Sequence, residues 1–175
     1  MTRIITVASA KGGVGKTTTV ASLAAALAQL RQSVIAVDGN VTTSNLGIHL
    51  GIPLYPVTIQ DVLRGRADIR EAVYKHRLGF RVVPADVSLS KLMIPRAQEY
   101  IEAFDKLLRR SDFILVDCAA GLGREAVSAI AAADEVITVT LPELPALMDA
   151  YKLVQVAERE EAKNIGVIVN RVRRE

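Results

Sequence analysis

The chain has 175 residues, of which 50% are hydrophobic and only 4% are aromatic, and this composition excludes a disordered chain and indicates one α/β domain with an aliphatic core. The formal net charge of +3 permits acidic partners without requiring one. A single cysteine, Cys118, excludes a disulfide framework and favours a cytoplasmic location, and no apolar run is long enough to span a membrane.

Short apolar runs alternate along the chain with segments of helical periodicity. Leucines and valines recur at helical spacing in two segments, which predicts helices within residues 18–30 and 142–163. The apolar runs lack a polar face, as strands covered by helices on both sides do, and they occupy residues 4–9, 34–38, 80–85, 113–118, 135–140 and 165–170. The alternation predicts a single domain over residues 1–175, of the α/β class, with a three-layer, doubly wound and mostly parallel sheet.

The loop after the first apolar run contains a phosphate-binding pattern. Residues 10–17 read AKGGVGKT and fit G-x-x-x-x-G-K-[ST], apart from Ala10 at the first glycine. Glycines let backbone N–H groups turn toward an anion, and the helix that follows points its positive end at the same place. Lys16 would contact the β and γ phosphates and Thr17 would bind Mg²⁺. The pattern predicts a P-loop NTPase with ATP or ADP and Mg²⁺ as cofactors, the nucleotide being held by Gly12, Gly13, Val14, Gly15, Lys16, Thr17 and Thr18.

A second lysine, Lys11, stands in the same loop. The segment KGGVGKTT resembles the deviant phosphate loop of the MinD/ParA family of ATPases, and TIQDVLRG and DFILVDC are similar to segments of archaeal MinD-like sequences. In that family the extra lysine crosses a dimer interface to the nucleotide of the other subunit. The resemblance therefore implies an ATP-dependent homodimer in which Lys11 acts in catalysis together with Lys16, since a cation supplied in trans stabilises the transferring phosphate only in the dimer. Without the resemblance, Lys11 would be read as a surface lysine.

Two further strand ends carry carboxylates. VDGN, after the second run, resembles the family's V-D-x-D segment, so Asp38 is expected near Mg²⁺ while Asn40 replaces the catalytic aspartate. An amide keeps the size of a carboxylate but has neither its charge nor its basicity, so we expect Asn40 to slow hydrolysis. The alternative is that Asn40 serves only a local turn. In FILVDC, four apolar residues lead to Asp117, a Walker B pattern that supplies a further carboxylate to hydrated Mg²⁺.

The sixth apolar run ends in Asn170, and Arg171 follows it. The resemblance implies that this pair lines the adenine site, and an amide can present both an acceptor and donors to a base edge. The alternative is an ordinary polar strand end. Members of the family continue well past this strand, so we expect the C-terminal part of the usual family domain to be absent, in a truncated chain or in a naturally short relative.

Other polar features are not assigned to a site. Cys118, His49 and His76 lack the spacing of metal ligands, so no metal cluster is expected. The basic stretch 64–81 is expected to be a solvated helix face, with contact to DNA or anionic lipid as the alternative.

The resemblance implies a MinD-like molecular switch that dimerises around Mg-ATP and hydrolyses it to ADP and phosphate, for cell division or other spatial regulation. It also implies a regulatory protein partner and a cytoplasmic protein that is peripheral at a membrane in a full-length form. Two alternatives stay open: a ParA-type partition ATPase that binds nonspecific DNA, and a nucleotide-binding protein with little turnover.

Overall fold

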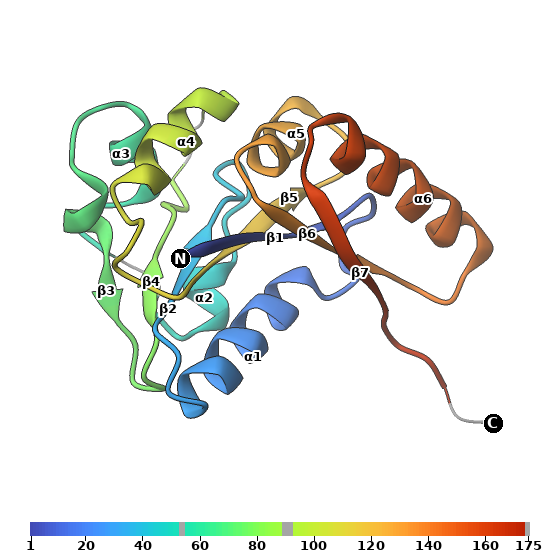
Figure 1. The fold of residues 1–175 in the computed structure, drawn as a ribbon, viewed down its shortest axis with the longest axis horizontal. Coiled ribbons are helices and arrows are strands. Elements are labelled where there is room, and N and C mark those ends of the chain that lie inside the picture. The colour runs from blue at the N-terminus through green and yellow to red at the C-terminus, as the bar shows by residue number, and fades with distance from the viewer. Residues whose placement is uncertain (53–54, 89–92, 174–175) are drawn as a thin grey trace.

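The computed structural model describes residues 1–52, 55–88 and 93–173, which form one seven-stranded sheet (Figure 1). The strand order is β3-β4-β2-β5-β1-β6-β7, and all neighbours are parallel apart from the antiparallel pair of β3 and β4. The chain runs outward from β1 to β2 and β4 and then returns through β5 to continue with β6 and β7 on the other side. The strands are β1 (Arg3–Ser9), β2 (Val34–Asp38), β3 (Tyr74–Lys75), β4 (Arg81–Val83), β5 (Phe113–Ala120), β6 (Glu135–Thr140) and β7 (Lys163–Val169).

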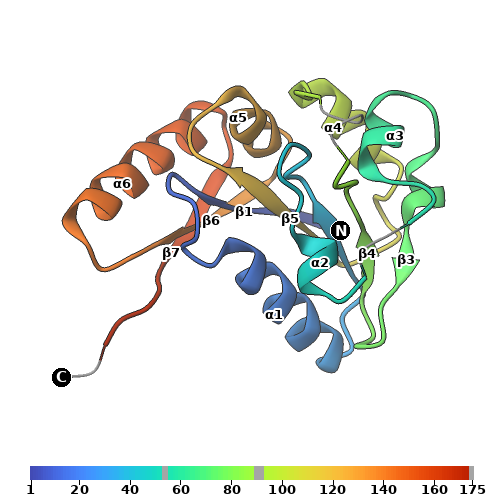
Figure 2. The same cartoon turned by 180° about the vertical axis from the view of Figure 1, so that it is seen from behind.

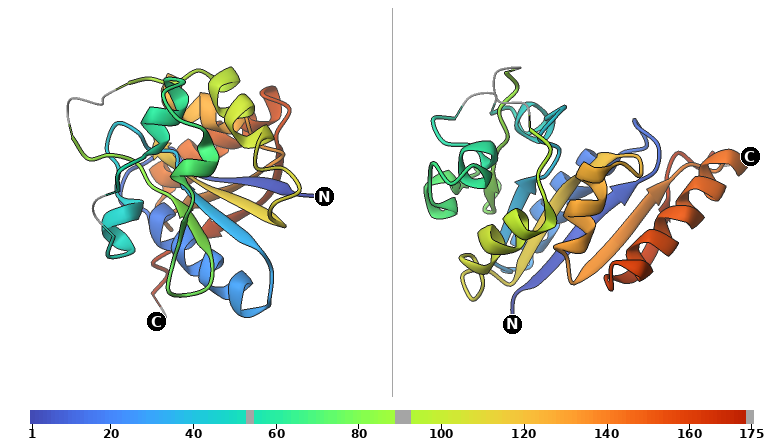
Figure 3. Two further views of the ribbon diagram at one scale, coloured as in Figure 1. Left: turned by 90° about the vertical axis from the view of Figure 1, so that its left-hand side faces the viewer. Right: turned by 90° about the horizontal axis from the view of Figure 1, so that it is seen from above.

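Helices cover both faces of this sheet (Figures 1 and 2). One face carries α1 (Lys16–Gln29) and α2 (Leu46–His49). The other face carries α3 (Ile59–Leu63), α4 (Ala97–Asp105), α5 (Arg124–Ala131) and α6 (Leu144–Arg159), and a 3₁₀ helix, η1 (Ile69–Ala72), follows α3. Figure 3 shows the twist of the strands between these two layers. In the parts of the chain that the structure describes, no helix combines the length and the apolar character needed to cross a membrane.

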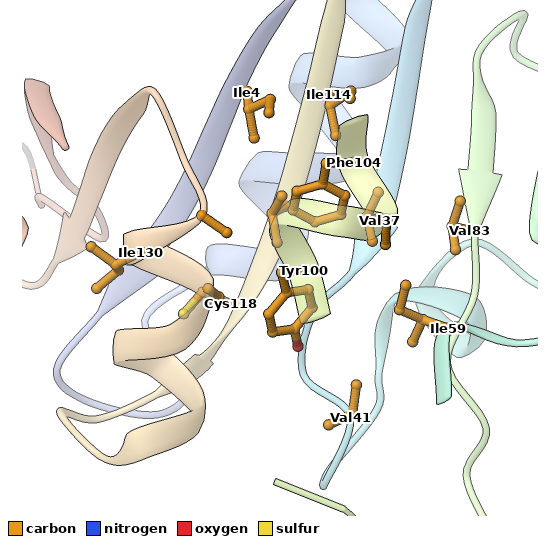
Figure 4. Close-up of a cluster of buried hydrophobic side chains, with 14 of the residues drawn as sticks. Ile4, Val37, Val41, Ile59, Val83, Tyr100, Phe104, Ile114, Cys118 and Ile130 are labelled. Atoms are coloured by element: carbon orange, nitrogen blue, oxygen red, sulfur yellow. The ribbon is translucent and has the colours of Figure 1, made fainter. Parts of the chain in front are cut away.

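Alternate residues of the central strands pack into two hydrophobic clusters, one on each face of the sheet. On β5, Ile114 belongs to the cluster under α4 and α5, whereas Leu115 belongs to the cluster under α1. Figure 4 shows the first cluster, where Tyr100 and Phe104 of α4 lie beside Val37 and Ile114 of the sheet. Burying each such side chain stabilises the fold by about 1.5–3 kcal/mol. The aliphatic runs of the sequence therefore form the middle layer.

The structure confirms the predicted three-layer, doubly wound fold. The runs 34–38 and 135–140 coincide with β2 and β6, and the remaining predicted strands overlap β1, β4, β5 and β7.

The prediction of a helix face over residues 64–81 is wrong. This stretch forms η1 and a hairpin of β3 and β4. The side chain of Asp68 accepts a hydrogen bond from the N–H of Arg70 and caps the short helix. Gly79 adopts φ 94°, which glycine tolerates, and the chain reverses there. These local interactions determine the structure of residues 64–81 more strongly than the pattern of charges that predicts a helix.

Candidate functional site

Residues 10–15 connect β1 to α1 at the carboxyl edge of the sheet, where ligands of such folds bind. Gly13 and Gly15 have φ of 73° and 110°, in the left-handed region that favours glycine. α1 begins at Lys16 without a side-chain cap on its N-terminus, which leaves its first N–H groups available to an anion. A pocket of about 340 Å³ opens at this point, lined by this loop and the start of α1 through Thr18, together with Asn40, Thr43, Asn45, Ala120 and Arg171.

Lys16 is buried at the floor of this pocket, with 8% of its surface exposed. Its Nζ donates a hydrogen bond to Oγ of Ser9 at 3.0 Å. Burial lowers the pKa of Lys16, while the nearby charge of Asp117 acts in the opposite direction. Since an ammonium group has three donors, Lys16 retains hydrogen-bonding capacity for a phosphate. Ser9 was missed by the sequence pattern, which starts at Ala10, although a polar residue at the end of an apolar strand was the available signal.

Two predicted carboxylates lie side by side, because Asp38 of β2 and Asp117 of β5 are aligned partners in the sheet. Oγ1 of Thr17 donates to Oδ2 of Asp117 at 2.6 Å, so the predicted Mg²⁺ ligands Thr17 and Asp117 meet. Asp38 is fully buried and its Oδ2 accepts hydrogen bonds from Oγ of Ser44 at 2.7 Å and from N of Leu46 at 3.0 Å. The structure thus brings together residues that are up to 100 positions apart.

The electrostatics of this pair favour a cation. Burial raises the pKa of Asp38 to about 7, and the charge of Asp117 adds to this, while hydrogen bonds from Ser44, Leu46 and Asn40 act the other way. Burial raises the pKa of Asp117 to about 6, against the hydrogen bond from Thr17 and the charge of Lys16.

One oxygen of this pair also lacks a protein partner. Oδ1 of Asp117 is buried and accepts no hydrogen bond. In the described ranges, no three His, Cys, Asp or Glu side chains gather as metal ligands. Mg²⁺ needs no such cage, because it keeps several waters and takes one or two carboxylates together with phosphate oxygens. A hydrated Mg²⁺ ion therefore fits the free oxygen of Asp117 and the hydroxyl of Thr17.

Asn40 lines the pocket and is tied to its own loop. Its Oδ1 accepts from N and Oγ1 of Thr43 at 3.2 and 3.0 Å, and its Nδ2 donates to the carbonyl oxygen of Thr43 at 2.7 Å. Asn45 donates to the same carbonyl at 2.7 Å. Asn40 lines the pocket while it closes a local turn. Its position is therefore compatible with both predictions, a role at the site of the catalytic aspartate and a purely local role in the turn.

Lys11 lies at the exposed rim of the loop. Its Nζ is 3.4 Å from Oε2 of Glu143, the residue that precedes α6, and both side chains are more than half exposed, at 53% and 56%. An exposed pair of this kind contributes at most about 1 kcal/mol, so Lys11 can leave Glu143 at little cost.

Asn170 and Arg171 bind the backbone of the glycine-rich loop through their side chains. Nδ2 of Asn170 donates to the carbonyl oxygen of Val14 at 2.8 Å, and Nη2 of Arg171 donates to that of Gly13 at 2.8 Å. A Cβ atom on Gly15 would lie 2.5 Å from Nδ2 of Asn170. The family resemblance predicts that this pair contacts the base, and the contact with the loop backbone is an additional role that only the fold reveals. Contact with adenine stays a prediction.

Comparison with known proteins finds matches over nearly the whole chain. A family model described as an AAA domain matches residues 2–167. An uncharacterized ATP-binding protein of Methanocaldococcus jannaschii is 40% identical over 171 residues, which are 98% of this chain and 65% of that protein. The septum site-determining protein MinD of Thermotoga maritima is 38% identical over 177 residues, again 98% of this chain and 65% of that protein. The chain therefore spans about two thirds of the length of these curated relatives.

Among solved structures, the septum site-determining protein MinD of Pyrococcus horikoshii, complexed with Mg-ADP, superposes with a TM-score of 0.94 at 38% identity. The match covers 100% of this chain and 72% of that one. The predicted P-loop NTPase type of the fold is confirmed by this match.

Proposed function

The chain belongs to the MinD/ParA family of P-loop ATPases, and from that premise we propose that it is an ATP-dependent molecular switch that binds Mg-ATP and hydrolyses it to ADP and phosphate. The observation that carries the proposal is the buried cluster at the carboxyl edge of the sheet. There, at the start of an uncapped helix, the ammonium of Lys16 donates to Ser9 and the hydroxyl of Thr17 donates to Oδ2 of Asp117, whose Oδ1 accepts no hydrogen bond.

Each group has a chemical role toward the nucleotide. The N–H groups of the loop and of the first turn of α1 bind phosphate oxygens, and Lys16 neutralises the charge that develops on the γ phosphate. Thr17, Asp117 and Asp38 would hold Mg²⁺, which when bound neutralises charge between the β and γ phosphates. Asn40 borders the phosphate end of the pocket and would orient the attacking water. As an amide it cannot take a proton from that water, so turnover is slow.

Dimerisation is part of the proposal. Lys11 is exposed and weakly paired, so it is available to a second subunit that docks over the pocket. We propose that ATP brings two subunits together around two nucleotides, and that each Lys11 contacts the phosphates of its neighbour.

The cellular role is proposed from the family. We propose spatial regulation, such as cell division, by a cytoplasmic protein that acts with a regulatory protein partner and peripherally at a membrane. A second candidate is a nucleotide-binding protein with little turnover. The observation that favours it is the set of three hydrogen bonds between the Asn40 side chain and Thr43, which hold both Oδ1 and Nδ2 in the local turn.

The proposal is tested by calorimetric titration of the protein with Mg-ATP and Mg-ADP. Lys16→Ala removes a buried, charge-assisted phosphate contact and should weaken binding about tenfold or more. Lys163→Ala removes an exposed lysine of β7, far along the chain from the loop, and should leave the affinity unchanged. Equal affinities for the parent and Lys16→Ala, with both proteins folded by circular dichroism, would contradict the phosphate-loop assignment.

A further inference from the structure

Glu125, in the first turn of α5, hydrogen-bonds to a loop that follows a different strand. Its Oε2 accepts a hydrogen bond from Oγ1 of Thr42 at 2.6 Å, and its Oε1 accepts one from N of Thr42 at 3.1 Å. Thr42 follows β2 in the segment that leads to α2, while Glu125 follows β5. One carboxylate therefore joins the segment that carries Asn40 to the segment that carries Asp117. No sequence motif used above includes either residue.

The bonded threonine is next to the residue that holds Asn40. Thr43 makes hydrogen bonds with the Asn40 side chain through its N, its Oγ1 and its carbonyl oxygen. Because the backbone N and the hydroxyl of Thr42 are both held, the planar Val41–Thr42 peptide and the Cα atom from which the chain continues to Thr43 are held in place. The contact of Thr42 with Glu125 therefore anchors the chain immediately before the residue that binds the Asn40 amide.

Other contacts hold the rest of this segment to the strands and to α3, and one of them reaches β5, where N of Gly39 donates to the carbonyl oxygen of Asp117 at 2.9 Å. Ser44 and Leu46 donate to Asp38, which lies on β2 itself, and Gln60 donates to the carbonyl oxygen of Val41. Glu125 is distinct because it ties the segment to the helix that follows Asp117. A shift of α5 would therefore move the Asn40 side of the pocket as well.

We propose that Glu125 is a positioning residue for the nucleotide site, which acts through Thr42 to hold Asn40 at the phosphate end of the pocket and couples that loop to α5. The inference rests on the proposed function, and it adds a residue that does not touch the nucleotide. Loss of the contact frees the Asn40 loop without removing any phosphate-binding group.

The first test measures amide hydrogen exchange of residues 40–46 in the nucleotide-free protein. Glu125→Gln keeps the shape of the side chain but removes its charge, so the hydrogen bond from N of Thr42 loses its charge assistance, while the new NH₂ group can pair with the Thr42 hydroxyl only as a donor. We expect exchange of the Thr42 amide to become about fivefold faster, as the loss of about half the strength of a charge-assisted hydrogen bond implies. Thr42→Val removes the hydroxyl donor without changing charge and should act in the same direction, whereas Thr42→Ser restores the hydroxyl and the parent behaviour. Unchanged exchange in Glu125→Gln would overturn the proposal.

The second test measures single-turnover hydrolysis and nucleotide affinity in the same variants. We expect Glu125→Gln and Thr42→Val each to slow the chemical step about fivefold or more with Mg-ATP affinity changed less than about twofold, and their combination to be less than additive. Thr42→Val excludes an explanation by the lost charge of Glu125. A fall in affinity equal to the fall in rate, or equal rates in all variants, would overturn the positioning role.

Failure of the proposed function can be distinguished from failure of the positioning role, because ATP binding and hydrolysis are measured on the parent protein alone. If the parent binds Mg-ATP and does not turn it over, hydrolysis is rejected. The positioning role is then decided by exchange in the presence of Mg-ATP. Protection of residues 40–46 in the parent but not in Glu125→Gln supports it, and equal protection in both overturns it.

Discussion

At the residue scale, Asn40 is the position where replacing the amide nitrogen by a carboxylate oxygen should change the rate of ATP hydrolysis. We expect Asn40→Asp to raise the single-turnover rate of ATP hydrolysis at least about tenfold, because a carboxylate can draw on the proton of the water that it orients. The structure adds a reason. Nδ2 of Asn40 donates to the carbonyl oxygen of Thr43 at 2.7 Å, and a carboxylate oxygen would be repelled from that carbonyl, toward the pocket. Affinity for ATP should not improve, since the new charge faces the γ phosphate.

The matched control for this change is Asn45→Asp. Asn45 lines the same pocket, donates to the same carbonyl of Thr43, and receives the same change in charge. We expect its hydrolysis rate to stay within about twofold of the parent, because charge alone does not activate the water. A similar acceleration in both variants would assign the effect to the charge of the loop and not to position 40.

At the scale of elements, the phosphate loop meets the start of α6 through Lys11 and Glu143. We expect Lys11→Ala to reduce the ATP-dependent dimer fraction, measured by light scattering with Mg-ATP, while nucleotide affinity of the monomer changes less than about twofold. The reason is that Lys11 is more than half exposed and contributes little to its own subunit, so its removal acts on the interface.

Lys152→Ala is the control for this experiment. Lys152 is an exposed lysine of α6 that pairs with Asp149 at 3.1 Å, so it matches Lys11 in charge and exposure. Its loss should leave the dimer fraction unchanged. The role of Lys11 across the interface is rejected if Lys11→Ala dimerises with ATP as well as Lys152→Ala and the parent do.

At the scale of the whole molecule, the buried carboxylates make stability depend on pH. Burial raises the pKa of Asp38 to about 7 and of Asp117 to about 6, above their ordinary value of 3.8. The folded state therefore binds more protons than the unfolded state between about pH 4 and pH 7, and the stability of the nucleotide-free, metal-free protein falls as pH rises through that window. We expect its Tm to be several degrees lower at pH 7.5 than at pH 5, since about 1 kcal/mol moves Tm by about 2–4 °C in a domain of this size.

Asp38→Asn tests the assignment of this dependence. Its oxygen can accept from Ser44 and Leu46 as the carboxylate does, while the titrating charge is gone. The fall in Tm from pH 5 to pH 7.5 should be reduced in this variant and preserved in Asp149→Asn, which removes an exposed carboxylate of α6. Identical slopes in all three proteins would show that Asp38 is not the source. Added Mg²⁺ should raise the Tm of the parent more at pH 7.5 than at pH 5, because the cation binds the charged carboxylates.

Much of the fold could be predicted because it depends on local pattern. The apolar runs have the two-sided burial of central strands, and β2 and β6 begin and end where their runs do. The prediction for the basic stretch 64–81 is wrong because its charges are typical of a solvated helix. Its structure depends instead on the cap at Asp68, the turn at Gly79 and the pairing of β3 with β4 in a short hairpin. Specific capping and turn residues outweigh a pattern of charges, which is only a weak prior for a helix.

The phosphate loop follows from the sequence alone, because glycines at positions 12, 13 and 15 and Lys16 between a strand and a helix dictate an anion site through backbone geometry and the helix terminus. The sequence also marks Asp38 and Asp117, since each ends an apolar run and parallel strands end at one edge. Only the tertiary structure placed Ser9 on Lys16, Asn170 on the carbonyl of Val14, and Glu125 on Thr42. The last two contacts join residues 156 and 83 positions apart. No periodicity or spacing encodes such pairs, because sheet order and helix placement alone bring them within hydrogen-bonding distance.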